Sequence, residues 1–303
     1  MENITSVRPG RTAGIWYGIL SAATFGLIPL FSIPVLNAGM DTMSVLFYRF
    51  AIACIGMLGI LLFNRKSLAL TAREVGLMAL FGLLYDGSAL CLYYGYQYMS
   101  SGAATTLIFM YPVWTAVIMA VFFRERLKPK TVAAIALALT GVFLLSTDGQ
   151  ESGRAFGPMV VAIVTMSGFF YAVYMVMVDR MNVREMGSLK LTFYTLLFAW
   201  IFLTLYLLVT GAEIKAVPDA LSLTNLILLG ILPTVISNFL LIRSIAAIGS
   251  TLAAILGAFE PVMAVVVGGA VFGEAFTLRT AAGMSAIILS VAALVVKKNG
   301  PKK

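Results

Sequence analysis

The sequence predicts an all-α membrane protein built from ten transmembrane helices, which form two inverted repeats of five helices each. Three observations lead to this fold class: an apolar composition, ten apolar runs of helical length, and a similarity between the two halves of the chain. Of the 303 residues, 61% are hydrophobic and only 11% are charged, whereas soluble domains have about 45–50% apolar and about 25% charged residues. Together with a mean hydropathy of +0.99, this composition predicts that most of the chain lies in a lipid bilayer.

The apolar runs have the length that a membrane helix needs, which is about 20 residues. They are joined by short connections, and no stretch between them could hold a large soluble domain. The first run follows a polar tail and is longer than the apolar core of a cleaved signal peptide, so we predict that it is a transmembrane helix. The ten predicted helices cover residues 14–35, 42–63, 74–98, 101–123, 130–146, 156–179, 189–209, 222–246, 249–272 and 278–296.

The positive charges indicate how these helices are oriented. Ten crossings place both termini on the same side of the membrane. If that side is the cytoplasm, 17 of the 21 Lys and Arg residues fall in cytoplasmic tails and connections, three fall on the other side, and Arg49 lies within a helix. Cytoplasmic loops of membrane proteins carry such an excess of Lys and Arg. The sequence therefore predicts a multi-pass plasma (inner) membrane protein with both termini in the cytoplasm.

The two halves of the chain resemble each other. Residues 100–134 align without gaps with residues 249–283 and share proline, valine, phenylalanine, glutamate and threonine at equivalent positions. Because each half has an odd number of helices, the second half crosses the membrane in the opposite direction. The predicted organisation is a cytoplasmic tail (1–13), a first repeat (14–147), a second, inverted repeat (148–296) and a second cytoplasmic tail (297–303).

The repeated segment contains the pattern Pro-x12-Glu, as Pro112 with Glu125 and as Pro261 with Glu274. This pattern, followed by a final short helix in each half, resembles the drug/metabolite transporter superfamily over essentially the whole chain. Within it the chain is most similar to the EamA-type branch and to bacterial amino-acid exporters. The resemblance implies a basket-shaped bundle whose central cavity is lined by the first, third, fourth, sixth, eighth and ninth helices. It also implies secondary transport of small metabolites, and that one chain can function as a monomer.

An acidic residue, Asp86, interrupts the third predicted helix at its centre. A charge at the centre of a bilayer costs about 3 kcal/mol or more. Gly82, Ala89 and Tyr93 share its helical face, and this partly polar stripe should face a cavity or another helix. Asp86 is therefore a candidate for substrate binding or proton coupling. The alternative is a static ion pair with Arg49, its possible charge partner in the second helix.

A second carboxylate, Glu260, lies midway along the ninth helix, directly before Pro261. Its equivalent in the first half is Tyr111, before Pro112. Each proline lacks a backbone N–H and leaves a carbonyl without its usual partner, so both prolines predict helix kinks. Glu260 can bind a substrate ammonium group or carry a proton. We predict that Asp86 lies at a similar depth, so that the two carboxylates suit a cationic group on a small substrate.

Aromatic and polar side chains deep within the predicted helices form a third group of candidates: Tyr85, Tyr93, Tyr111, Trp114, Ser237 and Asn238. The aromatic members are too deep for an interfacial belt. They either line a cavity, where they can stack on a cationic substrate, or pack between helices. The two polar members bond either to substrate or to a neighbouring helix. Glu125 and Glu274 lie at helix ends, and we predict a structural role for both.

The residue inventory argues against several other classes of protein. The chain has no histidine and only two cysteines, both in apolar runs, so we predict no metal site and no cofactor. An intramembrane aspartyl protease needs two membrane aspartates, and Asp86 is the only one in mid-helix. No Walker motif is present, which argues against ATP as the energy source. A seven-helix receptor does not fit two repeats of five helices.

These observations and the resemblance together predict a transporter and not an enzyme. The expected activity is export of small metabolites, amino acids in the first place, by alternating access. The alternative is efflux of drugs or organic cations. The expected partners are a small substrate that bears an amine and the lipid bilayer. Nucleic acid is not an expected partner, because the net charge of +8 is explained by the cytoplasmic loops.

Overall fold

The computed structural model describes residues 10–98, 107–146, 158–181, 186–273 and 277–295. This part of the chain consists of helices joined by short turns and loops, which confirms the all-α class. The elements are α1 (Arg11–Phe25), α2 (Ile28–Asn37), α3 (Thr42–Phe63), α4 (Ala72–Tyr98), α6 (Tyr111–Phe123), α7 (Pro129–Ser146), α8 (Pro158–Arg180), α9 (Ser188–Thr210), α10 (Ala220–Gly230), the π-helix η2 (Ile231–Ile236), α11 (Ser237–Ile248), α12 (Ser250–Leu256), α13 (Phe259–Phe272) and α14 (Leu278–Val295).

Seven helical stretches in the described ranges are long and apolar enough to cross a membrane. They are Arg11–Asn37, Thr42–Phe63, Ala72–Leu92, Pro158–Arg180, Ser188–Thr210, Ala220–Ile248 and Ser250–Val271. Three shorter apolar helices cover Tyr111–Phe123, Pro129–Leu144 and Leu278–Ala293. Each of the ten apolar runs predicted from the sequence therefore contains a helix, and most of the helix bounds agree with the predicted ones to within a few residues.

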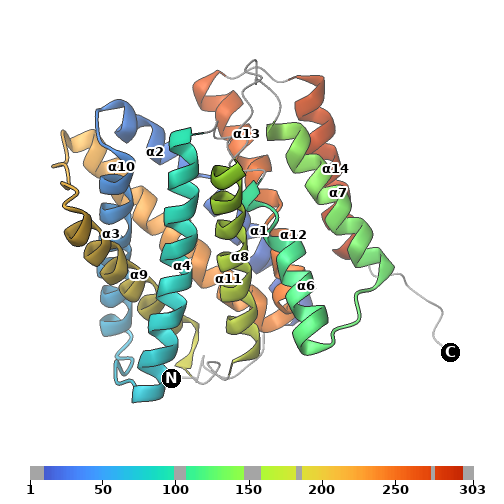
Figure 1. Ribbon diagram of the computed structural model, residues 1–303, viewed down its shortest axis with the longest axis horizontal. Helices are drawn as coiled ribbons and strands as arrows, with labels where there is room; N and C mark the ends of the chain where they lie inside the picture. The colour runs from blue at the N-terminus through green and yellow to red at the C-terminus, as the bar shows by residue number, and fades with distance from the viewer. Residues whose placement is uncertain (1–9, 99–106, 147–157, 182–185, 274–276, 296–303) are drawn as a thin grey trace.

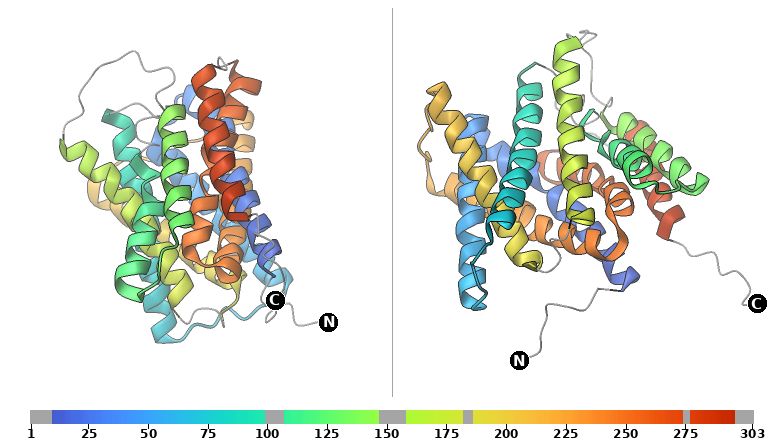
Figure 2. Two further views of the ribbon diagram at one scale, coloured as in Figure 1. Left: turned by 90° about the vertical axis from the view of Figure 1, so that its right-hand side faces the viewer. Right: turned by 60° about the horizontal axis from the view of Figure 1, so that its bottom comes forward.

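The helices pack as a bundle in which elements from distant parts of the sequence lie side by side (Figure 1). α4 packs against α8 and α9, α1 packs against α11, and α7 packs against α14. The pair α7 and α14 forms one side of the bundle in two of the views (Figures 1 and 2). α3, α9 and α10 lie at the opposite side in Figure 1, which leaves α1, α8, α11 and α12 in the middle.

Two of the long stretches are interrupted near their centres. α1 ends at Phe25 and α2 begins at Ile28, while α12 ends at Leu256 and α13 begins at Phe259. A third stretch contains the six-residue π-helix η2 between α10 and α11. Irregular backbone at membrane depth is tolerated where it is buried in protein or lines a cavity, and π-helical turns are frequent at functional sites. These irregularities therefore favour a functional site in the middle of the bundle.

The two prolines that were predicted to kink long helices instead lie at the start of new helical segments. Pro112 is the second residue of α6 and Pro261 is the third residue of α13. A missing N–H is tolerated there, because the N–H groups of the first turn have no intrahelical partner. The preceding turns are closed by hydrogen bonds from Met110 N to Leu107 O and from Ala258 N to Ile255 O. The chain therefore bends just before each proline and not at it.

The bundle is held together by one large apolar cluster that joins α3, α4, α8, α9 and α11. Phe50, Phe81 and Tyr174 are among its largest fully buried side chains. Close approach of helices also depends on small residues, as at Gly82 of α4. A Cβ atom at Gly82 would lie only 2.7 Å from the backbone nitrogen of Ala199 in α9, which is closer than packed atoms can approach.

Candidate functional site

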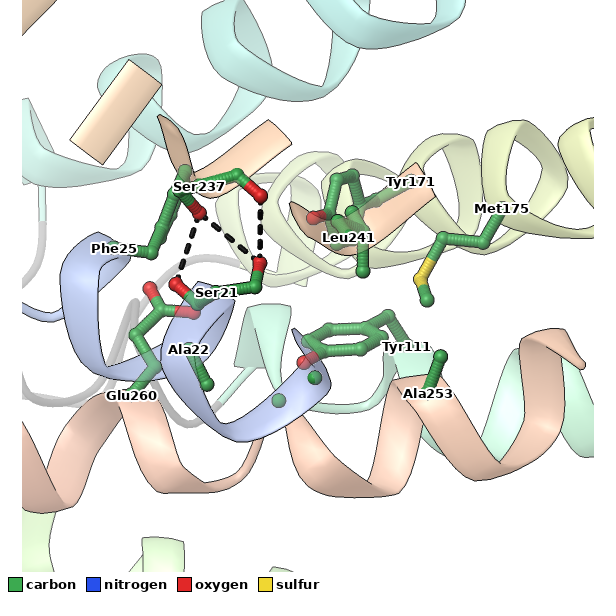
Figure 3. Close-up of a pocket in the computed structure, with 12 residues that line it drawn as sticks. Ser21, Ala22, Phe25, Tyr111, Tyr171, Met175, Ser237, Leu241, Ala253 and Glu260 are labelled. Carbon is green, nitrogen blue, oxygen red and sulfur yellow. Dashed lines mark hydrogen bonds between the residues drawn. The ribbon is translucent and has the colours of Figure 1, made fainter. Parts of the chain in front are cut away.

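A small cavity lies in the middle of the bundle, where the interrupted helices meet (Figure 3). Its volume is about 20 Å³, which gives room for roughly one water molecule. Its polar and aromatic lining is Ser21, Phe25, Tyr111, Tyr171, Ser237 and Glu260, and small or aliphatic residues complete the wall. The lining comes from α1, α6, α8, α11, α12 and α13. In the predicted numbering these are the first, fourth, sixth, eighth and ninth helices, while the third helix supplies none of the lining residues.

Glu260 supplies the carboxylate of this cavity. It is the second residue of α13, directly after the interruption, and its N–H donates to Gly257 O at 2.9 Å. The first turn of a helix carries partial positive charge, which favours a carboxylate. Within the described part of the protein, the carboxylate oxygens accept no hydrogen bond, and the residue keeps some exposed surface. Figure 3 shows the side chain beside Ser21 of α1. Glu260 is therefore available to bind a cationic group or a proton.

Arg49 of α3 places a positive charge beside the cavity. Its Nε donates to Thr234 Oγ1 at 2.6 Å, and its guanidinium carbon lies 5.4 Å from the ring centre of Phe25, a cavity residue. Arg49 therefore lies beside a residue that lines the cavity with Glu260, although Arg49 and Glu260 form no ion pair among the described residues. Thr234 belongs to η2 and donates to Leu229 O at 2.8 Å. The π-helix thus fixes the hydroxyl that orients the arginine.

Asp86 lies outside the cavity. The residue is 2% exposed, and its Oδ1 has no hydrogen-bond partner in the described ranges. Gly82, one turn earlier on the same face, packs against α9. The static pair between Asp86 and Arg49 that was considered from the sequence is wrong, because Arg49 bonds to Thr234 instead and no ion pair joins it to Asp86 in the described structure. Asp86 is not among the residues that line the cavity with Glu260.

The aromatic candidates differ in their positions. Tyr111 lines the cavity, and its ring meets the ring of Tyr171 edge-on at 5.1 Å. Tyr171 stacks near Tyr174 at 6.1 Å, and Tyr174 lies 5.8 Å from Tyr85. This row of four tyrosines connects the cavity to α4. Tyr85 therefore belongs to the outer shell of the site, behind the residues that line it.

Trp114 packs away from the cavity lining. Trp114 packs edge-on against Phe169 at 5.6 Å, and its buried Nε1 has no partner among the described residues. It is not one of the residues that line the cavity. Tyr93 belongs to α4, but its side chain lies outside the part that the structure describes. Packing is the role that the geometry supports for Trp114.

The two polar candidates of α11 bond to neighbouring helices. Ser237 Oγ donates to Ser21 O at 2.9 Å, and Ser21 Oγ donates to Ser237 O at 2.8 Å. This reciprocal pair also lines the cavity (Figure 3). Asn238 Nδ2 donates to Tyr85 Oη at 3.0 Å and to Thr234 O at 2.7 Å. Ser237 therefore lines the cavity, whereas Asn238 holds α4 against the end of η2.

Of the two repeat glutamates, the structure describes Glu125, which is not among the residues that line the cavity. Glu125 follows α6, and its Oε2 lies 3.1 Å from a terminal nitrogen of Arg180 at the end of α8. This contact joins two helix ends and agrees with a structural role. Glu274 lies outside the described residues, so its predicted role stays a prediction.

Among the polar and aromatic residues of the cavity, the sequence does not predict three: Ser21, Phe25 and Tyr171. Ser21 and Tyr171 are polar side chains within apolar runs, but such residues are common in membrane helices and give a weak signal. Phe25 directly precedes Gly26, where α1 breaks. A Cβ atom at Gly26 would lie 2.5 Å from Glu260 O, so this glycine lets the two interrupted helices touch. Nothing in the apolar pattern indicates that contact.

Comparison with known protein families gives a match over residues 12–147 and 158–296. The chain belongs to the EamA-like transporter family. Its similar proteins include an uncharacterized transporter of Archaeoglobus fulgidus, which is 30% identical over 90% of this chain and 93% of its own length. The uncharacterized inner membrane transporter YedA of Escherichia coli (strain K12) is 25% identical over 82% of this chain and 80% of its own length. The protein is thus a membrane transporter with several apolar helices.

Other comparisons agree with this assignment. The uncharacterized transporter YetK of Bacillus subtilis is 23% identical over 84% of this chain and 78% of its own length. A crystal structure with 17% sequence identity superposes with a TM-score of 0.78, covering 94% of this chain and 97% of the solved chain. At that identity the superposition shows the fold alone, and it shows that the arrangement of helices described here occurs in a solved protein.

Proposed function

We propose that this EamA-family transporter is a secondary carrier that exports small metabolites, amino acids in the first place, by alternating access and without ATP. One observation carries the proposal. The Glu260 carboxylate lies in a cavity between interrupted helices, keeps exposed surface, and accepts no hydrogen bond from the described residues. In discontinuous membrane helices, such positions bind substrates and coupling ions.

The charges around the cavity suit a zwitterion. Glu260 matches an ammonium group, and the guanidinium of Arg49, held beside Phe25, matches a carboxylate. The aromatic rings of Phe25, Tyr111 and Tyr171 give the wall an apolar part for a side chain. An amino acid presents these three features together, and a glutamate that exchanges a proton for the ammonium group offers a route for coupling.

The packing of the helices supports an inverted pair of five-helix repeats. A twofold relation between the halves would exchange the third helix (α4) with the eighth (α10, η2 and α11). It would also exchange the sixth helix (α8) with the first (α1 and α2). The contact of α4 with α8 then corresponds to the contact of α11 with α1, and both contacts are extensive. α7 and α14, the fifth and tenth helices, pack against each other across the proposed axis. Ten crossings with both termini in the cytoplasm follow from this proposal.

The size of the cavity supports a mechanism with moving helices. A volume of about 20 Å³ holds about one water and no amino acid. Substrate binding therefore requires the helices around Glu260 to separate. In inverted-repeat carriers, one bundle rocks against the other around a fixed site, so the structure represents a closed arrangement between two open ones.

A second candidate function is efflux of organic cations. The row of tyrosines beside Glu260 favours it, because aromatic faces attract cations that lack a carboxylate partner. Arg49 separates the two possibilities: an amino-acid carrier needs its positive charge, whereas a carrier of organic cations does not.

Counterflow of labelled substrates in proteoliposomes tests the proposal. The panel includes small neutral, aromatic and cationic amino acids and a quaternary amine, and the variants are Glu260→Gln and Arg49→Gln, with Glu213→Gln in an exposed loop as the matched control. We expect saturable amino-acid exchange that falls about 30-fold or more in Glu260→Gln, since removing one partner of a buried charge contact costs about 2–5 kcal/mol. Full exchange in Glu260→Gln would contradict the assigned site. Quaternary-amine transport without amino-acid exchange, retained in Arg49→Gln, would establish the second candidate.

A further inference from the structure

A second, larger pocket lies at one end of the bundle, where the connection from α6 to α7 meets the starts of α1 and α12. Its volume is about 390 Å³, and it shares no lining residue with the central cavity. Four basic residues line it: Arg11, Arg126, Lys128 and Lys130. By the charge pattern of the sequence, this end is the predicted cytoplasmic side.

The pocket carries an excess of positive charge. Glu125 is the one carboxylate among its described lining residues, and it is already engaged by Arg180 at 3.1 Å. The nearby Asp179 is not a lining residue and accepts from Ser250 N and Ser250 Oγ, each at 3.0 Å. The described lining thus holds four basic side chains and one carboxylate, and a space with this balance of charge attracts an anion.

A buried hydroxyl gives an independent indication of a ligand. Thr251 lines the pocket and is 7% exposed, and its buried Oγ1 has no hydrogen-bond partner in the described structure. A buried polar group without a partner is costly and rare, and a bound acceptor would satisfy it after a shift of the Thr251 side chain toward the pocket. Ile248, Leu252 and Ile255 add an apolar wall beside it, so the pocket combines cations, a free hydroxyl and an apolar surface.

We propose that this pocket binds a phosphate-bearing group, with the phosphate among the basic side chains and an apolar part against the wall. Guanidinium groups bind phosphate in a bidentate manner, and basic pockets between membrane helices on the cytoplasmic side take anionic head groups. The phosphate comes either from an anionic phospholipid or from a small phosphate in solution. The proposal does not depend on the substrate of the central cavity.

Titration calorimetry on the full chain in an uncharged detergent tests whether this pocket binds phosphate. The probes are dihexanoyl-phosphatidylglycerol, dihexanoyl-phosphatidylcholine and inorganic phosphate. The main variant is Arg126→Gln with Lys130→Gln, and the matched control is Arg65→Gln with Lys66→Gln, which removes the same charge from the exposed α3–α4 connection. Thr251→Val removes the hydroxyl and keeps every charge, and thermal unfolding checks that each variant is folded.

We expect phosphatidylglycerol to bind at least tenfold more tightly than phosphatidylcholine, whose choline cancels the phosphate charge. The main variant should lose roughly 30-fold in affinity, which is about 1 kcal/mol for each basic residue, while the control binds like the parent. Thr251→Val should lose about fivefold. Binding of phosphatidylglycerol alone assigns the phosphate to a lipid, and equal or exclusive binding of inorganic phosphate assigns it to a solute. Equal binding of both lipids without phosphate binding, or full affinity in a folded main variant, would overturn the proposal.

Discussion

At the residue scale, the hydroxyl of Thr234 holds the guanidinium group of Arg49 in place beside the cavity. Arg49 Nε donates to Thr234 Oγ1 at 2.6 Å, and Thr234 is fully buried. We predict that Thr234→Val lowers the free energy of unfolding by about 1.5–3 kcal/mol, because a buried cation loses its acceptor. It should also reduce amino-acid exchange, while Thr234→Ser retains both properties. Thermal unfolding in detergent and counterflow in liposomes measure the two effects, and equal behaviour of the Val and Ser variants would rule out this role.

A second residue-scale prediction concerns pH and a helix cap outside the membrane. Asp41 caps α3 and accepts from Ser44 N at 2.9 Å and from Ser44 Oγ at 2.7 Å. Burial acts to raise the pKa of Asp41, but the hydrogen bonds from Ser44 outweigh it, so the pKa lies below its ordinary value. Because the pKa of Asp41 is lower in the folded protein, ionised Asp41 makes its full contribution to stability above the unfolded-state pKa of about 4. This contribution is lost as the pH falls through the folded-state pKa.

We therefore expect Asp41→Ala to lower the free energy of unfolding by about 1 kcal/mol at pH 7, the usual value of an N-cap. The ionic part is small because Asp41 keeps contact with water. The difference between Asp41→Ala and the parent should shrink below about pH 4, whereas Asp41→Asn, which keeps a cap oxygen, should stay near the parent at pH 7. Unfolding in detergent at pH 7 and pH 3 measures this, and a difference that grows toward pH 3 would refute it.

The sequence predicts some residues of the cavity and not others. Glu260 is evident because a carboxylate within an apolar run has few structural uses. Asp86 looks similar in sequence, yet its side chain does not reach the cavity. Residues 85 and 86 point about 100° apart on a helix, and the rotation of α4 is set by its packing against α8 and α9, which the apolar pattern does not encode. Ser21 and Tyr171 are ordinary residues for a membrane helix, so their role becomes visible only when the helices are assembled.

At the element scale, the interruptions of the helices position the site. Gly26 ends α1, and a Cβ atom there would lie 2.5 Å from Glu260 O and 2.7 Å from Met263 Cβ. We predict that Gly26→Ala pushes α1 away from α13 and reduces amino-acid exchange at least tenfold. Its φ of −61° suits alanine, so the cause is steric and not conformational.

The matched control for this prediction is Gly59→Ala in α3. A Cβ atom at Gly59 meets nothing within 4 Å, and alanine favours a helix by up to about 1 kcal/mol over glycine. Gly59→Ala should therefore leave exchange unchanged and keep or raise the melting temperature. Counterflow measures the exchange of the Gly26→Ala and Gly59→Ala variants, and thermal unfolding measures their melting temperatures. Unchanged exchange in Gly26→Ala would show that contact between the interrupted helices is not needed.

The helices themselves follow from the sequence, because each apolar run of sufficient length forms one. Their interruptions follow from it only in part. The break between α1 and α2 lies between Gly26 and Pro29, and η2 contains Pro233, so each has a local signal. Pro233 has no N–H to donate to Leu229 O, and the Thr234 side chain supplies the donor instead. Pro112 and Pro261 signal an irregularity, and the structure places it in the turn before each proline, where the missing N–H leaves a carbonyl without its usual donor.

At the scale of the whole molecule, the membrane class is determined by composition alone, since 61% hydrophobic residues cannot be buried in a soluble domain of this size. The pairing of α4 with α8 and of α1 with α11 joins parts of the chain that lie far apart in sequence. Helices from both halves line the cavity that contains Glu260. Under the proposed mechanism, relative motion of the two halves opens this cavity to each side of the membrane in turn.

Access of a reagent to one cavity residue from each side of the membrane tests this claim most directly. The variant is Ser21→Cys in a chain whose Cys54 and Cys91 are replaced by alanine, and the control is a cysteine at Gly59, which faces outward from α3. A membrane-impermeant thiol reagent is added to either side of oriented vesicles, with and without the substrate found by counterflow. We predict that the cysteine at position 21 reacts from both sides and that substrate slows the reaction, while the control reacts from neither. Reaction from one side only, unchanged by substrate, would contradict alternating access at the Glu260 cavity.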